Sequence, residues 1–128
     1  MLQKAPMYAY LPAKDLARAK AFYEQKVGIK AKEERNGGVV FEFGDHTACF
    51  MYPTPFAGTS QASQAFWEVD DIEREVADLK ARGVTFEHYD VPGMDAVSGD
   101  IVTGGGARAA WFKDSEGNIL ALIQTMER

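Results

Sequence analysis

One sequence pattern occurs twice at the same length: an aspartate, an amphipathic segment and a closing glycine. Asp15 and Gly28 are 13 positions apart, and so are Asp70 and Gly83. An aspartate side chain accepts hydrogen bonds from the free N–H groups at a helix start, and glycine readily adopts the left-handed conformation that ends a helix. The repeated spacing therefore predicts two equivalent helices and a duplicated structural unit.

Both predicted helices have one apolar side. In the first, apolar residues recur at three- and four-residue steps: Leu16, Ala19, Phe22, Tyr23 and Val27. In the second, the apolar residues Ile72, Val76 and Leu79 follow the same rule, and Asp70 with Glu73 has the form of a capping box. Each helix is therefore expected to pack on a sheet.

Short apolar or aromatic segments separated by turn residues predict the strands. They lie at 7–11, 31–34, 39–43 and 47–52 in the first half, and at 64–69, 84–89, 108–113 and 119–124 in the second. We expect Pro12 to end the first strand. Each half then has the order βαβββ, which predicts an α+β fold with pseudo-repeats over 5–53 and 63–126, a connector over 53–63, and one domain over 1–128.

The two halves differ mainly in the segment 90–106, which is rich in glycine and lacks periodicity. We expect it to be a long irregular loop, and long loops in compact domains often carry function. Met94 is a candidate lid residue over a ligand, and Gly104 to Gly106 a candidate hinge.

Charge and composition exclude several classes of partner. The 128 residues include 14 Lys and Arg against 19 Asp and Glu, a net charge of −5, and no basic stripe suits nucleic acid. No apolar run is long enough for a membrane span or a signal peptide, so the mature chain is expected to begin near Met1. The single cysteine, Cys49, cannot form an internal disulfide, which favours a cytoplasmic location.

Three motifs resemble the vicinal oxygen chelate superfamily, which includes glyoxalase I, extradiol dioxygenases, and fosfomycin and bleomycin resistance proteins. They are Asp15-Leu16 with Phe22-Tyr23 and Val27-Gly28, Asp70-Asp71-Ile72 with Gly83-Val84, and Asp114-Ser115-Glu116-Gly117-Asn118 before Ile119. Many relatives have proline where this chain has Ser115. The resemblance implies two tandem βαβββ modules, whose curled mixed sheets surround a cleft, and a homodimer.

The metal-dependent relatives hold an ion through His, Glu or Gln at four strand positions. The corresponding residues here are Tyr8, Phe50, Gln64 and Ala121. Only Gln64 is a ligand of the usual kind, and one neutral amide does not hold a divalent ion. We therefore expect no metal and no cofactor. His46 is expected to be a solvated turn residue, and His88 a partly buried strand residue.

Since the resemblance implies that the four ligand positions face the cleft, strand alternation predicts which other side chains face it. With Met94 from the loop, the candidate ligand-binding residues are Tyr8, Tyr10, Phe50, Tyr52, Gln64, Phe66, Glu68, Trp111 and Ala121. This set is mostly aromatic and aliphatic, as in a pocket for a flat or amphipathic small molecule. Packing between closed sheets remains the alternative interpretation.

The resemblance and these residues together predict a metal-independent small-molecule-binding protein of the glyoxalase/bleomycin-resistance type. The alternative is a glyoxalase-type lyase or isomerase, either metal-dependent or working by acid–base chemistry through Glu68 and a tyrosine. A partner-binding module with a closed cleft is a third possibility. No catalytic residue is identified from the sequence.

Overall fold

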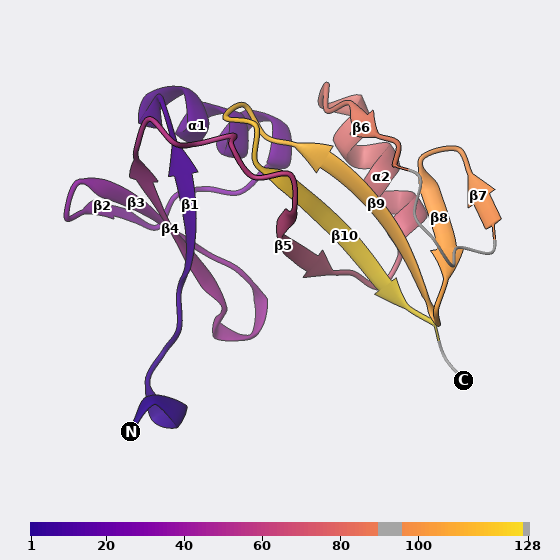
Figure 1. Cartoon of the computed structure of the whole chain (residues 1–128), viewed down its shortest axis with the longest axis horizontal. Helices are drawn as coiled ribbons and strands as arrows, with labels where there is room; N and C mark the ends of the chain where they lie inside the picture. Colours follow the sequence, from indigo (N-terminus) through magenta and orange to yellow (C-terminus); the bar gives the residue numbers. More distant parts are fainter. Residues whose placement is uncertain (90–95, 127–128) are drawn as a thin grey trace.

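The structure is a computed structural model that describes residues 1–89 and 96–126. It contains two β-sheets and two α-helices, so the predicted α+β class is confirmed (Figure 1). The first sheet has the strand order β1-β4-β3-β2. Its strands are β1 (Ala9–Ala13), β2 (Glu33–Arg35), β3 (Gly38–Glu42) and β4 (Ala48–Pro53).

The second sheet repeats this plan. Its strand order is β5-β10-β9-β8-β7, and β6 pairs with β9 next to β8. Its strands are β5 (Ser63–Glu68), β6 (Phe86–Glu87), β7 (Ala96–Ser98), β8 (Ile101–Gly104), β9 (Ala107–Lys113) and β10 (Ile119–Thr125). In both sheets the first strand of the half lies parallel to the last, and the other pairs are antiparallel.

The helices begin and end near the residues that the sequence predicts. Helix α1 (Leu16–Phe22) continues into a π-helical turn (Tyr23–Val27), which ends at Gly28 with φ +84°. The Asp15 side chain accepts a hydrogen bond from the Arg18 N–H at 3.0 Å. No helix in the described part of the chain is long and apolar enough to cross a membrane.

Helix α2 (Ile72–Ala81) corrects one prediction, because its N-cap is Asp71 and not Asp70. The Asp71 side chain accepts a hydrogen bond from the Arg74 N–H at 3.2 Å. Pairing with β10 extends one residue beyond β5, since the Val69 N–H donates to the Ile123 carbonyl at 2.9 Å. The chain therefore remains extended for longer than the capping pattern predicts.

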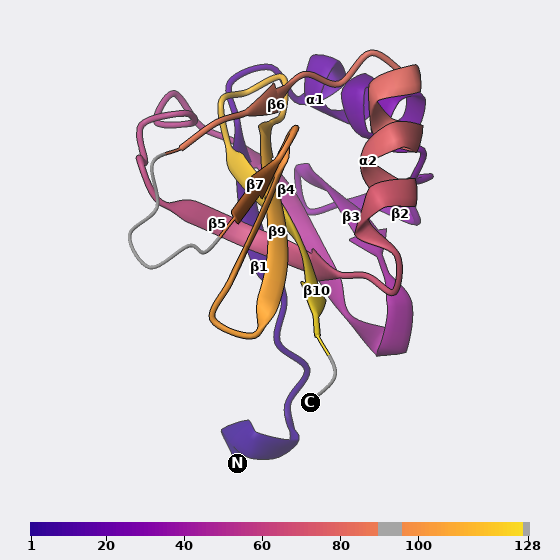
Figure 2. The same ribbon diagram turned by 90° about the vertical axis from the view of Figure 1, so that its right-hand side faces the viewer.

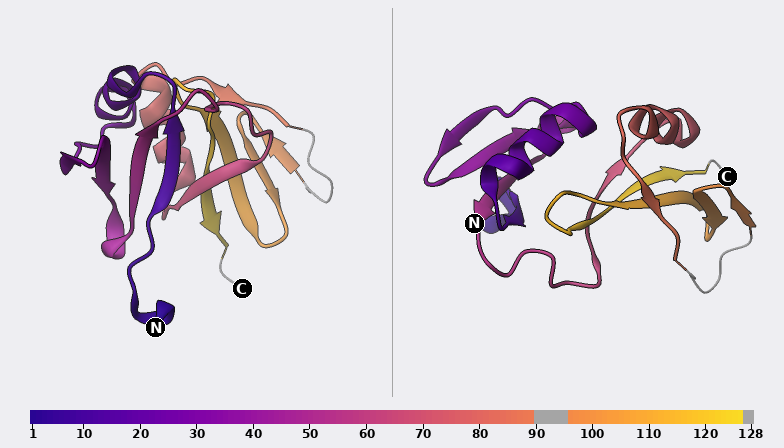
Figure 3. Two further views of the ribbon diagram at one scale, coloured as in Figure 1. Left: turned by 60° about the vertical axis from the view of Figure 1, so that its left-hand side comes forward. Right: turned by 90° about the horizontal axis from the view of Figure 1, so that it is seen from above.

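One hydrophobic core is shared by the two halves. Tyr23 and Phe41 from the first half and Ile72, Phe112 and Leu120 from the second are fully buried in it. Figures 2 and 3 show both helices on the same side of the molecule, while the connector 54–62 runs along the opposite side. Each sheet therefore has one face in the core and one face free of helices.

Two strand predictions are wrong in detail. Pro12 lies inside β1, where it is tolerated because β1 is an edge strand and needs no second row of N–H donors. The segment 90–106 is not irregular throughout, because β7 and β8 form a hairpin that continues the second sheet through β9. Gly99 permits its turn with φ +61°. Met94 lies outside the described residues.

The turn between β9 and β10 joins the two halves through a buried carboxylate. The Glu116 side chain is 0% exposed and accepts hydrogen bonds from the Lys14 and Asp15 N–H groups at 2.9 Å and from Arg18 Nε at 2.8 Å. Next to it, the Tyr23 hydroxyl donates to Asp114 at 2.8 Å. Burial opposes ionisation of Glu116, but these donors outweigh it and lower its pKa to about 2.

We expect Glu116→Gln to lower the free energy of unfolding at pH 7 by about 2 kcal/mol, because the amide removes the charge that pairs with Arg18 and replaces one of the two acceptor oxygens with an NH2 donor. The stabilisation by Glu116 should be complete above its ordinary pKa of 4.5 and fall as the pH approaches 2. Urea denaturation of both proteins across this pH range measures the effect.

The control is Glu34→Gln, which removes an exposed ion pair with Lys20 of 3.1 Å. Exposed pairs contribute little, so this variant should change stability by less than about 0.5 kcal/mol. Equal stability losses in the two variants would contradict the role of the buried carboxylate.

Candidate functional site

The faces without helices carry exposed aromatic side chains. In β1, Leu11 is 3% exposed and points into the core, whereas its neighbour Tyr10 is 68% exposed. In β5, Trp67 packs in the core against Phe112 with ring centroids 6.2 Å apart, whereas Phe66 is 62% exposed. Alternation along each strand therefore leaves aromatic rings on the open face of each sheet.

The open face of the first sheet contains a hollow of about 490 Å³, which we call the tyrosine hollow. Its lining residues are Tyr8, Tyr10, Arg35, Asn36 and Phe50. The Tyr10 ring meets the rings of Phe50 and Tyr52 edge to face, with centroids 6.0 and 4.8 Å apart. The Arg35 guanidinium carbon lies 6.0 Å from the centre of the Tyr8 ring, so the hollow combines aromatic walls with a positive charge.

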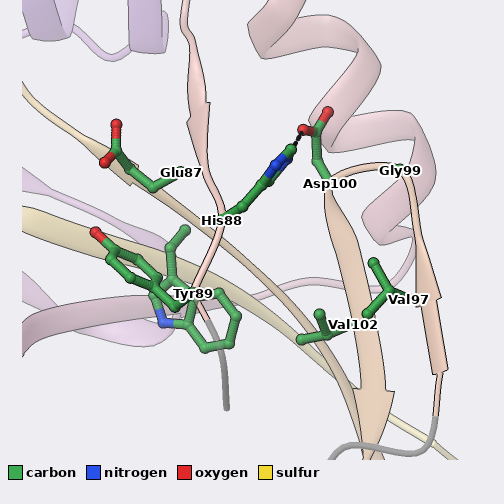
Figure 4. Close-up of a pocket in the computed structure, with 8 residues that line it drawn as sticks. Glu87, His88, Tyr89, Val97, Gly99, Asp100 and Val102 are labelled. Carbon is green, nitrogen blue, oxygen red and sulfur yellow. Dashed lines mark hydrogen bonds and ion pairs between the residues drawn. The ribbon is translucent and has the colours of Figure 1, made fainter.

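The second sheet contains a hollow of about 330 Å³ (Figure 4). It lies beside β9, where the strand that pairs with β9 changes from β6 to β8. We call it the tryptophan hollow. Its lining residues are Glu87, His88, Tyr89, Val97, Gly99, Asp100, Val102 and Trp111. The Tyr89 and Trp111 rings meet edge to face with centroids 5.8 Å apart. This hollow is lined by two carboxylates and a histidine, whereas the tyrosine hollow is lined by an arginine.

A polar cluster holds the hairpin wall of the tryptophan hollow. Asp100, at the turn between β7 and β8, contacts His88 Nε2 at 2.6 Å and Lys80 Nζ at 2.8 Å, and its own side chain is 14% exposed. These hydrogen bonds from Lys80 and His88 lower the pKa of Asp100. Asp100 therefore links the hairpin to α2 and to the residue after β6.

The position of His88 corrects a prediction. Its side chain is 68% exposed and follows β6, whereas the sequence predicts a partly buried strand residue. Its partner Asp100 belongs to the segment that lacks periodicity, so nothing in the sequence pairs the two. His46 lies in an exposed turn, as expected.

The predicted site residues separate into groups. Tyr8, Tyr10 and Phe50 line the tyrosine hollow, with Tyr52 against Tyr10, and Trp111 lines the tryptophan hollow. The remaining described residues lie on the second sheet and line neither hollow: Gln64, Phe66, Glu68 and Ala121. Ala121 is 2% exposed, between Trp111 on β9 and Phe66 on β5. Neither hollow is lined by residues from both sheets.

Sequence reasoning missed the polar residues of both hollows. Arg35 and Asn36 lie where β2 turns into β3, a turn that the Asn-Gly pair predicts, but their proximity to Tyr8 depends on how the sheet folds. Glu87 lies directly opposite Trp111 in the β6–β9 pair. That register could have been found only by knowing which strands pair.

The four positions that correspond to the metal ligands of relatives do not fit an ion. Phe50 and Ala121 offer only carbon, which leaves the Gln64 amide and the Tyr8 hydroxyl as the polar groups of the set. Among residues 1–89 and 96–126, no group of three or more His, Cys, Asp or Glu side chains is placed to hold a metal. Burial raises the pKa of the Cys49 thiol to about 11, which favours the protonated, unreactive form at neutral pH.

Residues 6–122 match the family model of the Glyoxalase/Bleomycin resistance protein/Dioxygenase superfamily. The chain belongs to this superfamily. A comparison with curated protein sequences gives no match. This match confirms the resemblance that the three sequence motifs indicate, and it covers nearly the whole chain.

Solved structures of this superfamily share the fold. TnmS3, "an antibiotic binding protein from Streptomyces sp. CB03234", is 22% identical with a TM-score of 0.71, and the match covers 98% of each chain. A glyoxalase/bleomycin resistance protein/dioxygenase from Alicyclobacillus acidocaldarius is 17% identical with a TM-score of 0.71, covering 97% of this chain and 93% of the other. Lactoylglutathione lyase from Agrobacterium tumefaciens is 20% identical with a TM-score of 0.66, covering 94% and 93%.

We expect Asp100→Asn to loosen the β7–β8 hairpin, because the neutral amide loses the charge that attracts Lys80 and His88. Amide hydrogen exchange over 96–104 should become about fivefold faster, which corresponds to about 1 kcal/mol of local stability. Glu42→Gln is the control, since it removes an exposed ion pair with Lys32 of 2.8 Å on the other sheet. Unchanged exchange of the hairpin in Asp100→Asn would contradict its role.

Proposed function

We propose that this protein binds a small aromatic or amphipathic molecule on the open faces of its sheets without a metal ion. The observation that carries the proposal is the pair of hollows walled by aromatic rings, together with the absence of a fitting donor set at the ligand positions of metal-dependent relatives. Both volumes lie in the range of roughly 300–1,000 Å³ that is typical of small-molecule sites.

Exposed rings supply the binding free energy in this proposal. Tyr10 is 68% and Tyr89 38% exposed, so a ligand ring placed against them removes apolar surface from water. Each Å² of apolar surface buried contributes about 25 cal/mol. The tyrosine hydroxyls and the charged residues at the edges of the hollows would set the orientation of the ligand.

The residues of the two hollows support binding more directly than catalysis. TnmS3 is an antibiotic-binding protein, which supports ligands of antibiotic type for this chain. The lyase alternative requires an acid–base group in the site, but Glu68 is exposed on β5 and lines neither hollow. No observation in the described residues favours a particular reaction.

A panel of planar aromatic compounds, screened by thermal denaturation in the presence of EDTA, tests this function. A compound present at 100 times its Kd should raise the free energy of unfolding by about 2.7 kcal/mol. Tyr10→Ala or Trp111→Ala should remove the effect, depending on the hollow used. The control Phe56→Ala, at an exposed connector residue, should retain it. Stabilisation that requires added Zn²⁺ or Ni²⁺, or that persists in both hollow variants, would contradict the proposal.

We also propose a cytoplasmic homodimer in which a second copy packs on the part of the open face that lies outside the two hollows. Phe66 is 62% exposed on the second sheet and lines neither hollow. Exposed apolar side chains on sheet faces are typical of protein interfaces. A two-fold axis would allow the same surface of two copies to pack together and leave both hollows open to a ligand.

We expect Phe66→Asp to shift the protein from dimer to monomer, because it places a charge in the apolar interface. The effect should weaken the dimer at least about tenfold. Light scattering coupled to gel filtration at micromolar concentration measures the mass. Phe56→Asp, which introduces the same charge at a residue 74% exposed in the connector, should remain dimeric. A monomeric wild-type protein would refute the proposed assembly.

A further inference from the structure

The two hollows differ in charge. The tyrosine hollow is lined by one charged residue, Arg35, whereas the tryptophan hollow is lined by Glu87, Asp100 and His88. Both have aromatic walls, so ring contacts alone do not distinguish their ligands. A charged group on the ligand would distinguish them, because its interaction with the hollow changes sign from one sheet to the other.

Glu87 is the carboxylate available to a ligand in the tryptophan hollow. Asp100 is already paired, with Lys80 Nζ at 2.8 Å and His88 Nε2 at 2.6 Å. Glu87 forms no ion pair with any described residue, and its side chain is half-buried beside Trp111, its partner in the β6–β9 register. An unpaired carboxylate near apolar walls attracts a cation more strongly than one in open water.

The negative charge of Glu87 lies close to the Tyr89 side chain. Burial raises the pKa of the Tyr89 hydroxyl, and the Glu87 carboxylate raises it further because a second negative charge there is unfavourable. The faces of the Tyr89 and Trp111 rings are also electron-rich and attract cations. Three neighbouring groups therefore favour positive charge at the same end of the hollow.

The other wall of the hollow is hydrocarbon. Figure 4 shows Glu87 and Tyr89 on one side, and Val97 and Val102 of the hairpin on the other. Val97 and Val102 lie opposite each other in the β7–β8 register, and the contacts of Asp100 hold that hairpin in place. A ligand with an apolar part and a cationic end would match both walls.

We propose that the tryptophan hollow selects planar aromatic ligands that carry a positive charge, and that Glu87 is the residue that determines this specificity. The inference rests on the proposed binding function and adds the chemical class of the ligand. Trp111 and Tyr89 contact the ring system, and Glu87 contacts the cationic group.

Two acridines of nearly identical shape test the inference. At pH 7.5, 9-aminoacridine is a cation and acridine-9-carboxylate is an anion, so they differ mainly in charge. Isothermal titration calorimetry of the full chain should give a Kd for the cation at least about tenfold lower, a difference of about 1.4 kcal/mol. Glu87→Gln should reduce this preference to less than about threefold, and Trp111→Ala should weaken binding of both compounds.

The matched control is Glu75→Gln, which changes the net charge by the same amount at an exposed position of α2. It should keep the full preference for the cation. Circular dichroism of each variant confirms that it is folded.

The outcomes separate the inference from the proposed function. Equal affinity for the two acridines, a preference for the anion, no binding of either, or an unchanged preference in Glu87→Gln would overturn the charge inference. If no planar aromatic compound of the wider panel stabilises the wild-type protein, the binding function itself fails.

Discussion

The two halves of this protein are joined by the hydrogen bonds of one buried carboxylate, that of Glu116. Glu116 has no exposed side-chain surface, and its hydrogen bonds reach Lys14, Asp15 and Arg18 at the start of α1, about a hundred residues earlier in the chain. A buried charge without such donors would be strongly destabilising. The turn of the second half and the helix start of the first half must therefore remain in contact whenever the protein is folded.

The packing of the two halves against each other leaves one face of each sheet available for binding. The helix-bearing faces of the two sheets meet in one core, where Tyr23 donates to Asp114 and Asn118 Nδ2 donates to the Pro12 carbonyl at 2.9 Å. The opposite faces receive no helix. Their aromatic residues remain exposed in two hollows, one on each sheet.

The local elements could be predicted because their signals lie within a few residues of each other. The Asp15 cap, the Gly28 helix end and the strands β3 and β4 agree with the pattern of the sequence. The predictions fail where a partner far along the chain decides. Pairing of Val69 with Ile123 moves the second cap to Asp71, and pairing with β9 converts 101–104 into a strand.

The candidate site shows the same division. Alternation along β1 and β4, together with the ligand positions of the relatives, predicts Tyr8, Tyr10 and Phe50 on one surface, since neighbouring residues of a strand point to opposite faces. The sequence by itself thus determined the duplicated unit, the superfamily and the aromatic character of the open faces. Only the tertiary structure decided that Arg35 belongs to one hollow and Glu87 to the other, because strand register, which depends on contacts between distant segments, brings each charge to its aromatic rings.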